Sequence, residues 1–473
     1  GSIRMSNNLS SNAELASLNI RLRFEANDIG PEENLEARLH GPAGYEKIVS
    51  VSSSGDSLFP GLGIDLGAGD QEVYWLSYRA LPDRSYFTGE GVATVMLNDA
   101  DGLYLSVGWF DMRAFLSEPG FEHKDTLDSF MASASFGGFT DVAILPNTQP
   151  LLQEKDLIEF IKYKSGQKIT SIHPITCLSK DCKEESLSEI LDLHFAGAVA
   201  FSDGLKSINQ SGLMLRALQY LQSIDGLLMN FANEKVLSAG GQMHEGAMST
   251  SLGMKGLPTV SEEIAIQKAI HLVEYTGGKI HFSTISTRKS VNLIRQAKEK
   301  GLKVTCDVAA YQLVFTDDDL QDFDTNFKVM PPLRSQEDQN ALWKGLADGT
   351  IDTIVSNHIP QDEESKKLEF NLADFGMLSF ESSFGSLNLA RKGKLSLEQL
   401  IQKWTTAPRS ILKQNQVAIQ EGEIAKLTLF DPEKEWVFEK NTIQSKSKNS
   451  PFVGRKMKGK VVAVFNQNKN SFI

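Results

Sequence analysis

The sequence has little cysteine, no long apolar run and no concentrated basic segment, and each absence excludes a class of protein. Its three cysteines, Cys177, Cys182 and Cys306, are too few for a disulfide framework and indicate reduced thiols in the cytoplasm. Cys177 and Cys182 lie five positions apart, which is not the spacing of a zinc knuckle. They are therefore expected to be isolated thiols rather than metal ligands.

No apolar run reaches the roughly 20 residues that a membrane span needs, so no membrane partner is expected. The net charge is −12 and no block of lysine or arginine occurs, which argues against a nucleic-acid partner because binding phosphates needs a concentrated basic surface. Histidine is scarce as well, and none of the eight histidines pairs with another in H-x-H, H-x-x-H or H-x-x-x-H spacing. The sequence therefore lacks the common histidine motifs of zinc enzymes.

What the chain does have is a regular alternation of two kinds of segment from about residue 107. Short β-branched segments alternate with amphipathic segments that end in glycine, and such glycines commonly end helices. The predicted strands are 105–113, 139–147, 168–177, 198–204, 226–232, 279–286, 302–310 and 351–358. The predicted helices include 186–197, 211–226, 261–278, 289–301 and 336–349. This order favours a parallel (β/α)₈ TIM barrel over a doubly wound sheet, since no G-x-G-x-x-G follows a strand.

The two ends of the chain differ from this pattern. Residues 1–106 are rich in turn signals and short strand-like pieces, which predicts a β-rich N-terminal segment. Residues 416–473 contain further strand patterns and are expected to complete the same small β-domain, so that the barrel occupies 107–415. A chain of 473 residues with 41% hydrophobic residues is long enough for two or three such units.

Several phrases of the sequence, in one order, resemble the dihydroorotases of the amidohydrolase superfamily. The matching phrases are "GWFDMRAFLSEPGFEHKDTL", "GGFTDVAILPNTQP", "AGAVAFSDG", "KIHFSTIST", "FDTNFKVMPPLRSQED", "DGTIDTIVSNHIPQDEESKK" and "EGEIAKLTLFDP". The resemblance extends from about Gly102 to Asn466, about three quarters of the chain. The resemblance implies an amidohydrolase-type barrel and a place in pyrimidine biosynthesis. It also implies a zinc-dependent hydrolase that interconverts dihydroorotate and carbamoyl aspartate.

The residues at the family's zinc-ligand positions depart from the family pattern. Where the family has H-x-H after the first barrel strand, this chain has Arg113 and Phe115, and Phe231 and Thr284 stand at the other two histidine positions. Arginine has no acceptor lone pair and a phenyl ring offers no ligand. The family's catalytic aspartate aligns with Asn357, whose amide cannot exchange a proton near neutral pH. We therefore expect no metal site and no zinc cofactor.

A few side chains are still expected at the end of the barrel where the strands finish, here called the mouth. Two roles are predicted for Arg113. It is either an arginine without a specific partner in a site that has lost its function, or a cation paired with Asp203 or another acid. Phe115 and Phe231 are predicted to fill space left by metal and substrate. The residues that could line a pocket or contact a ligand are Asn147, Asp203, Asp307, Tyr311 and His358. For Asn147 a structural role in a strand-to-helix turn is the alternative, and His281 is predicted to be a hydrogen-bonded core histidine.

The sequence leaves three functions open. The first is a non-catalytic dihydroorotase homologue (a pseudoenzyme) with a structural or regulatory role. For this function the resemblance implies aspartate transcarbamoylase as a partner. The second is an active cyclic-amide hydrolase with a rebuilt metal-free or atypical site, and the third is a sensor that binds a small molecule. A cytoplasmic homo-oligomer is expected in each case.

Overall fold

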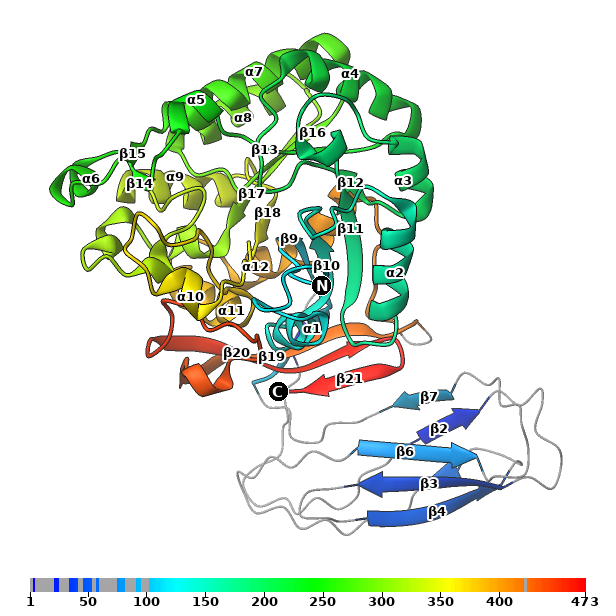
Figure 1. Ribbon diagram of the computed structural model, residues 1–473. Coiled ribbons are helices and arrows are strands. Elements are labelled where there is room, and N and C mark those ends of the chain that lie inside the picture. The colour runs from blue at the N-terminus through cyan, green and yellow to red at the C-terminus, as the bar shows by residue number, and fades with distance from the viewer. Residues whose placement is uncertain are drawn as a thin grey trace. The chain divides into compact units, whose positions relative to one another are not determined.

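The structure, a computed structural model, describes residues 102–420 and 423–473 together with seven strands before residue 101 (Figure 1). By chain contacts it divides into two compact units. One unit comprises Gly1–Arg4 and Tyr104–Ile473, and the other comprises Met5–Leu103. In the part of the chain that the structure describes, no helix combines the length and the apolar character needed to cross a membrane.

Eight parallel strands of the first unit form a (β/α)₈ barrel, which confirms the predicted fold class. In chain order they are β9 (Trp109–Ala114), β10 (Phe139–Ile144), β11 (Ser171–Thr176), β12 (Ala200–Phe201), β13 (Leu228–Phe231), β16 (Ile280–Ser283), β17 (Val304–Ala309) and β18 (Thr353–Val355). The first and last strands meet through a parallel bridge between Ala114 and His358 and a 2.8 Å hydrogen bond from the Phe115 N–H to the His358 carbonyl. These contacts close the sheet on itself.

Helices surround the strands on the outside of the barrel (Figure 1). The longer ones are α1 (Leu127–Phe136), α2 (Lys155–Ser165), α3 (Ile190–Ala196), α4 (Ser211–Leu221), α7 (Val260–Thr276), α8 (Arg288–Glu299), α9 (Gln336–Ala347) and α11 (Phe380–Ala390). The shorter elements are α5 (Lys235–Ser238), α6 (Ala247–Ser251), α10 (Glu363–Lys366), α12 (Leu397–Gln402), α13 (Thr406–Ile411), β14 (Met243–His244) and β15 (Gly256–Leu257). All five predicted helices are present.

The helix α7 shows why the sequence pattern succeeds here. Ile266, Ala269, Ile270 and Val273 recur at three- and four-residue spacing and are all buried. The helix ends at Gly277, whose φ of 70° is left-handed and suits a glycine. The apolar stripe and the glycine stop together define the element.

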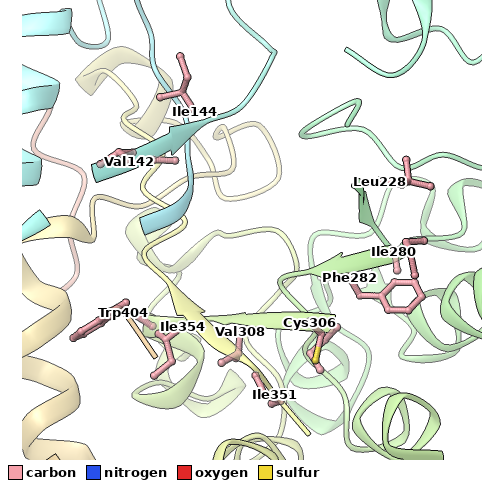
Figure 2. Close-up of a cluster of buried hydrophobic side chains, with 14 of the residues drawn as sticks. Val142, Ile144, Leu228, Ile280, Phe282, Cys306, Val308, Ile351, Ile354 and Trp404 are labelled. Carbon is pink, nitrogen blue, oxygen red and sulfur yellow. The ribbon is translucent and has the colours of Figure 1, made fainter. Parts of the chain in front are cut away.

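Side chains of the barrel strands alternate between two environments, as a period of two requires. Val142 and Ile144 belong to the cluster packed between strands and helices, together with outward side chains of β13, β16, β17 and β18 (Figure 2). Ala143 and Leu145 lie in a separate cluster inside the barrel. The same alternation turns His281 and Asp307 inward, since their neighbours Ile280, Phe282, Cys306 and Val308 belong to the outer cluster.

A second sheet brings both ends of the first unit together. It has the order β1 (Ile3–Arg4), β8 (Tyr104–Val107), β19 (Lys426–Val437), β20 (Lys456–Asn466) and β21 (Lys469–Phe472). The predicted strand 105–113 is in fact two strands that belong to different sheets. The break falls at Gly108, where a β-carbon would lie 2.2 Å from Thr140 Oγ1. The chain can pass from one sheet to the other only where that side chain is absent.

The unit Met5–Leu103 contains two three-stranded antiparallel sheets. One has the order β5 (Ser57–Leu58), β2 (Arg21–Phe24), β7 (Gly91–Thr94), and the other has the order β4 (Glu46–Ser52), β3 (Asn34–His40), β6 (Trp75–Ala80). The β-rich character predicted for this segment agrees with these strands. The domain boundaries predicted at residues 106 and 415 stay a prediction.

Candidate functional site

Arg113 reaches across the barrel mouth from the end of β9. Its Nε donates to Asn357 Oδ1 at 3.0 Å and its Nη2 donates to the Gly204 carbonyl at 3.3 Å. The guanidinium carbon lies 5.8 Å from the centre of the Phe231 ring. Because Asn357 and Gly204 follow β18 and β12 and Phe231 ends β13, the guanidinium occupies the middle of the mouth. Burial lowers the pKa of Arg113, and the attraction of nearby Asp307 opposes that shift.

Arg113 does not pair with Asp203, which was one of the two roles considered for it. The Asp203 carboxylate accepts hydrogen bonds from the Ser179 N–H at 2.9 Å and the Ser179 hydroxyl at 2.5 Å. Within residues 102–420 and 423–473, no carboxylate lies within ion-pair distance of Arg113. Asp203 is buried, and burial raises its pKa. The turn at Ser179 offers this carboxylate two donors and thereby takes the place of a cation.

Asn357 connects Arg113 to Tyr311. Its Oδ1 accepts from Arg113, and its Nδ2 donates to the Tyr311 hydroxyl at 2.7 Å. Asn357 has a left-handed φ of 48°, which asparagine tolerates better than most residues. Burial raises the pKa of Tyr311, so its hydroxyl stays protonated at neutral pH. An amide thus stands at the predicted catalytic position, and protein groups occupy both its oxygen and its nitrogen.

Asp307 forms a second buried cluster with His281 and Thr284. Its Oδ2 lies 2.8 Å from His281 Nε2, and its Oδ1 accepts from the Thr284 N–H at 2.6 Å. His281 Nδ1 lies 2.8 Å from the Thr305 hydroxyl, which confirms a hydrogen-bonded core histidine. Thr284 has a φ of 52°, an unusual value for a β-branched residue, and its hydroxyl has no partner within the described chain.

His358 does not join the mouth cluster. Its ring stacks on Phe380 of α11 at 4.2 Å and meets Phe130 of α1 edge-on at 5.9 Å. Its Nδ1 accepts from the Ser379 and Phe380 N–H groups at 3.2 and 3.4 Å. Burial lowers the pKa of His358 to about 3, so the ring is neutral at pH 7. These contacts place the imidazole among the helices.

Asn147 fixes the turn that follows β12. Its Nδ2 donates to the Asp203 carbonyl at 3.1 Å and its Oδ1 accepts from the Leu205 N–H at 2.8 Å. Gly204 between them has a φ of 67°, and a β-carbon on it would lie 1.9 Å from Asn147 Oδ1. These contacts agree with a structural role for Asn147, and its contact with a ligand stays a prediction.

Phe115 and Phe231 are both buried, with 7% and 5% of their surfaces exposed. The Phe115 ring lies 6.0 Å from the Phe121 ring, and the Phe231 ring faces Arg113. Burying each phenyl contributes roughly 1.5–3 kcal/mol to stability. The two rings are packing groups at positions where the resemblance implies ligands.

The pairing of Asp111 with Ser356 is a feature that the sequence pattern did not predict. The Asp111 carboxylate accepts from the Ser356 N–H at 2.9 Å and from its hydroxyl, which ties β9 to β18. Burial raises the pKa of Asp111 to about 7, although the hydrogen bonds from Ser356 act in the opposite direction. The alternation of side chains along a strand could have predicted where Asp111 lies, because Asp111 faces the same side as Arg113 two residues later.

The residues at the zinc-ligand positions do not fit zinc. Protein zinc sites use imidazole nitrogen, thiolate or carboxylate ligands. Arg113, Phe115 and Phe231 supply none of these, and the Asn357 oxygen is already an acceptor for Arg113. Across the described parts of the chain, no three or more histidine, cysteine or acidic side chains are arranged to hold a metal ion.

Comparison with known proteins agrees with this fold. A family model described as "Dihydro-orotase-like" matches residues 103–290. A protein of Citrifermentans bemidjiense named dihydroorotase is 41% identical over 366 residues, which cover 77% of this chain and 86% of that protein. A dihydroorotase of Acetivibrio thermocellus is 41% identical over 365 residues, which cover 76% and 86% of the two chains.

Solved structures show the same barrel at lower identity. L-hydantoinase from Arthrobacter aurescens superposes with a TM-score of 0.68 at 24% identity and covers 77% of this chain and 84% of its own. Dihydroorotase from Saccharomyces cerevisiae, in complex with 5-fluoroorotic acid, gives a TM-score of 0.59 at 17% identity, with 76% and 98% covered. At these identities the likeness concerns the fold alone.

Proposed function

Because the chain belongs to the dihydroorotase family, we propose that it is a non-catalytic dihydroorotase-like protein of pyrimidine biosynthesis with a structural or regulatory role. The observation that carries the proposal is the hydrogen bond between Arg113 and Asn357 in the middle of the mouth. It occupies two positions where the resemblance implies a metal ligand and a proton carrier.

The chemistry of cyclic-amide hydrolysis supports this proposal. Opening the ring requires an activated water and a group that accepts a proton and returns it to the leaving nitrogen. Asn357 cannot perform the second task, and its amide is held by Arg113 and Tyr311. The side chains of Arg113, Asp307 and Asn357 are also at most 1% exposed, so this arrangement leaves them out of reach of solvent.

The direct test measures metal content and turnover together. The purified chain is incubated with zinc, freed of excess metal and assayed for dihydroorotate ring opening and for bound zinc. The Citrifermentans bemidjiense relative serves as the positive control. We expect neither stoichiometric zinc nor turnover. Zinc-dependent turnover by this chain would overturn the proposal.

The partner proposed for the structural or regulatory role is aspartate transcarbamoylase, on the strength of the family resemblance. The test mixes the two purified proteins from one organism and measures the mass of the resulting particles by sedimentation. A stable joint complex is the expected result. Two independently sedimenting species would remove this partner. Self-association and a cytoplasmic location are parts of the same proposal, and the first is measured in the same experiment.

A hydrolase that works without zinc is the alternative, and the buried His281–Asp307 couple inside the barrel favours it. Such an enzyme would open dihydroorotate in the presence of a chelator and would lose that activity in Asp307→Asn. A sensor would instead bind dihydroorotate without opening it. Calorimetry in chelator, followed by product analysis, separates these two functions from the first.

A further inference from the structure

Two of the three cysteines lie face to face beside the mouth. Cys177 directly follows β11, and Cys182 ends a 3₁₀ turn at Lys180–Cys182. Their sulfur atoms are 3.3 Å apart, and the two residues are 0% and 3% exposed. The third cysteine, Cys306, is equally buried, but its Sγ faces the Thr350 carbonyl at 3.4 Å. The chain therefore has one pair of neighbouring thiols, and its third thiol is equally buried but has no thiol beside it.

The backbone around Cys182 holds the pair together at some conformational cost. Asp181, Cys182 and Glu184 have left-handed φ values of 55°, 50° and 62°, which non-glycine residues rarely adopt. The turn is held by hydrogen bonds from the Cys182 N–H to the Ser179 carbonyl and from the Glu184 N–H to the Ser179 hydroxyl, each 3.0 Å. A further bond of 2.7 Å joins the Asp181 N–H to Gln153 Oε1. Strained turns of this kind persist only where their surroundings fix them.

We propose that Cys177 and Cys182 are a modification site that forms a reversible disulfide by exchange with a small-molecule disulfide. In the first step, the Cys182 thiolate attacks one sulfur of the small molecule and releases one small thiol. In the second step, the Cys177 thiolate attacks Cys182 in this mixed disulfide and releases the second small thiol. The two cysteines are oxidised, the small disulfide is reduced, and the two cysteine protons pass to the two released thiols.

The surroundings assign the order of attack. Cys182 lies between the exposed residues Asp181 and Lys183, whereas Cys177 lies at the end of a buried strand. The Cys182 thiol and burial both raise the pKa of Cys177. The thiol that lies deeper, Cys177, is suited to the second attack, because a mixed disulfide at Cys182 is then already close to it.

The pair is connected to the mouth through Ser179, which lies between the two cysteines in sequence. Ser179 donates both its N–H and its hydroxyl to Asp203. The next residue, Gly204, supplies the carbonyl that accepts from Arg113 Nη2. Disulfide formation draws the sulfurs together and thereby shifts the turn that holds Asp203. This inference does not depend on whether the chain hydrolyses dihydroorotate.

The test equilibrates the folded chain of residues 1–473 with oxidised and reduced glutathione at a series of ratios, followed by acid quenching, alkylation and peptide mapping. We expect the number of alkylated cysteines to fall from three to one, with a linked Cys177–Cys182 peptide and alkylated Cys306. A chain that keeps three alkylated cysteines at the most oxidising ratio would overturn the proposal. So would a glutathione adduct that never resolves into the linked peptide.

Three variants sharpen the result. Cys306→Ser is the matched control, since it removes a buried thiol without a thiol neighbour, and it is expected to form the linked peptide at the same glutathione ratio as the natural chain. Cys177→Ser is expected to stop at a glutathione adduct on Cys182, and Cys182→Ser is expected to remain reduced. A glutathione adduct on Cys177 in Cys182→Ser, or the absence of the linked peptide in Cys306→Ser, would contradict the assignment. Peptide mapping of the natural chain is by itself enough to decide the proposal. A variant that folds poorly therefore does not prevent the test.

Discussion

Asn357 supplies a hydrogen-bond partner to two buried groups, Arg113 Nε and the Tyr311 hydroxyl. Arg113 Nε donates to its oxygen, and its nitrogen donates to the Tyr311 hydroxyl. Arg113 lacks a carboxylate within ion-pair distance in the described chain, so this neutral amide is one of only two acceptors recorded for its guanidinium, the other being the Gly204 carbonyl. A buried charge that loses a hydrogen-bond partner is costly. Asn357 therefore stabilises the buried Arg113, in addition to standing where the family resemblance implies an aspartate.

This pairing predicts the effects of two changes at residue 357. Asn357→Ala should lower the free energy of unfolding by about 1–3 kcal/mol, because Arg113 Nε loses its acceptor and Tyr311 loses its donor. Asn357→Asp should cost less at pH 7, because a carboxylate beside the guanidinium makes a charge-assisted bond. Denaturant unfolding measures both. Equal losses for the two variants would contradict the role given to Arg113, and Asn357→Asp is not expected to gain zinc-dependent turnover.

Gly204 offers a second test at the scale of one residue. Gly204 and Gly253 have almost the same left-handed φ, 67° and 65°, but only Gly204 has a neighbour where a β-carbon would lie. Gly253→Ala should cost about 1–2 kcal/mol from the backbone alone. Gly204→Ala should cost roughly 1–3 kcal/mol more, because the methyl group displaces Asn147. Thermal unfolding of the two variants measures the difference. Equal losses would show that the Asn147 contact is unimportant.

At the scale of single residues, the sequence predicts where a side chain lies better than it predicts which group that side chain binds. Period-two alternation and the family resemblance place Arg113 at the mouth, where the structure has it. Asp203, one of the partners considered for Arg113, binds elsewhere because a turn with left-handed residues brings Ser179 to that carboxylate. Such a turn depends on contacts among distant segments and leaves no periodic pattern. Which group a buried charged side chain binds depends on small differences in distance between candidate partners. The spacing of residues in a sequence does not contain that information.

At the scale of elements, strand periodicity predicts each barrel strand but not where one sheet ends. The segment 105–113 is mostly apolar on both sides of Gly108, yet β8 pairs with β19 while β9 enters the barrel. The change of sheet depends on the close approach of Thr140 to Gly108. A glycine inside a strand pattern is the one local sign of such a change.

Glu381 connects three elements and predicts a pH dependence. Its Oε1 accepts from the Ser133 hydroxyl of α1 and from the N–H groups of Gln444 and Ser445, while its Oε2 has no partner among the described residues. Burial raises the pKa of Glu381 from 4.5 to about 7, against the effect of these hydrogen bonds. Between these two values the unfolded chain loses the proton first, so stability falls as the pH rises, by at most about 1.4 kcal/mol per pH unit.

Glu381→Gln should remove this contribution, because the amide keeps an acceptor for Ser133 and does not titrate. Urea unfolding between about pH 4.5 and 7 should therefore show a shallower fall in stability for this variant than for the natural chain. Glu159→Gln is the control, since Glu159 is an exposed residue of α2. A pH profile that is unchanged in Glu381→Gln would show that Glu381 is ionised throughout.

At the scale of the whole molecule, the share of the chain that the family relatives match is similar in length to the compact unit that contains the barrel. The curated relatives cover 76–77% of the chain, and the unit built on Tyr104–Ile473 contains the barrel and the C-terminal strands. The sequence predicts that the C-terminal strands join an N-terminal segment. The pairing found is that of β19 with β8 and of β8 with the two residues of β1. Strand partners that lie far apart in the chain cannot be read from local pattern.

This division predicts that residues 104–473 fold without the preceding residues. The deletion removes β1 from the second sheet, a loss of about 1 kcal/mol per hydrogen bond, and leaves the barrel core intact. Tryptophan fluorescence is a suitable probe, since only Trp75 of the five tryptophans lies before residue 104. Deletion of residues 1–4 alone is the matched control, and both shortened chains should unfold at nearly the same urea concentration. If the shorter deletion unfolds normally and the longer one does not fold, the prediction that the barrel unit folds independently is wrong.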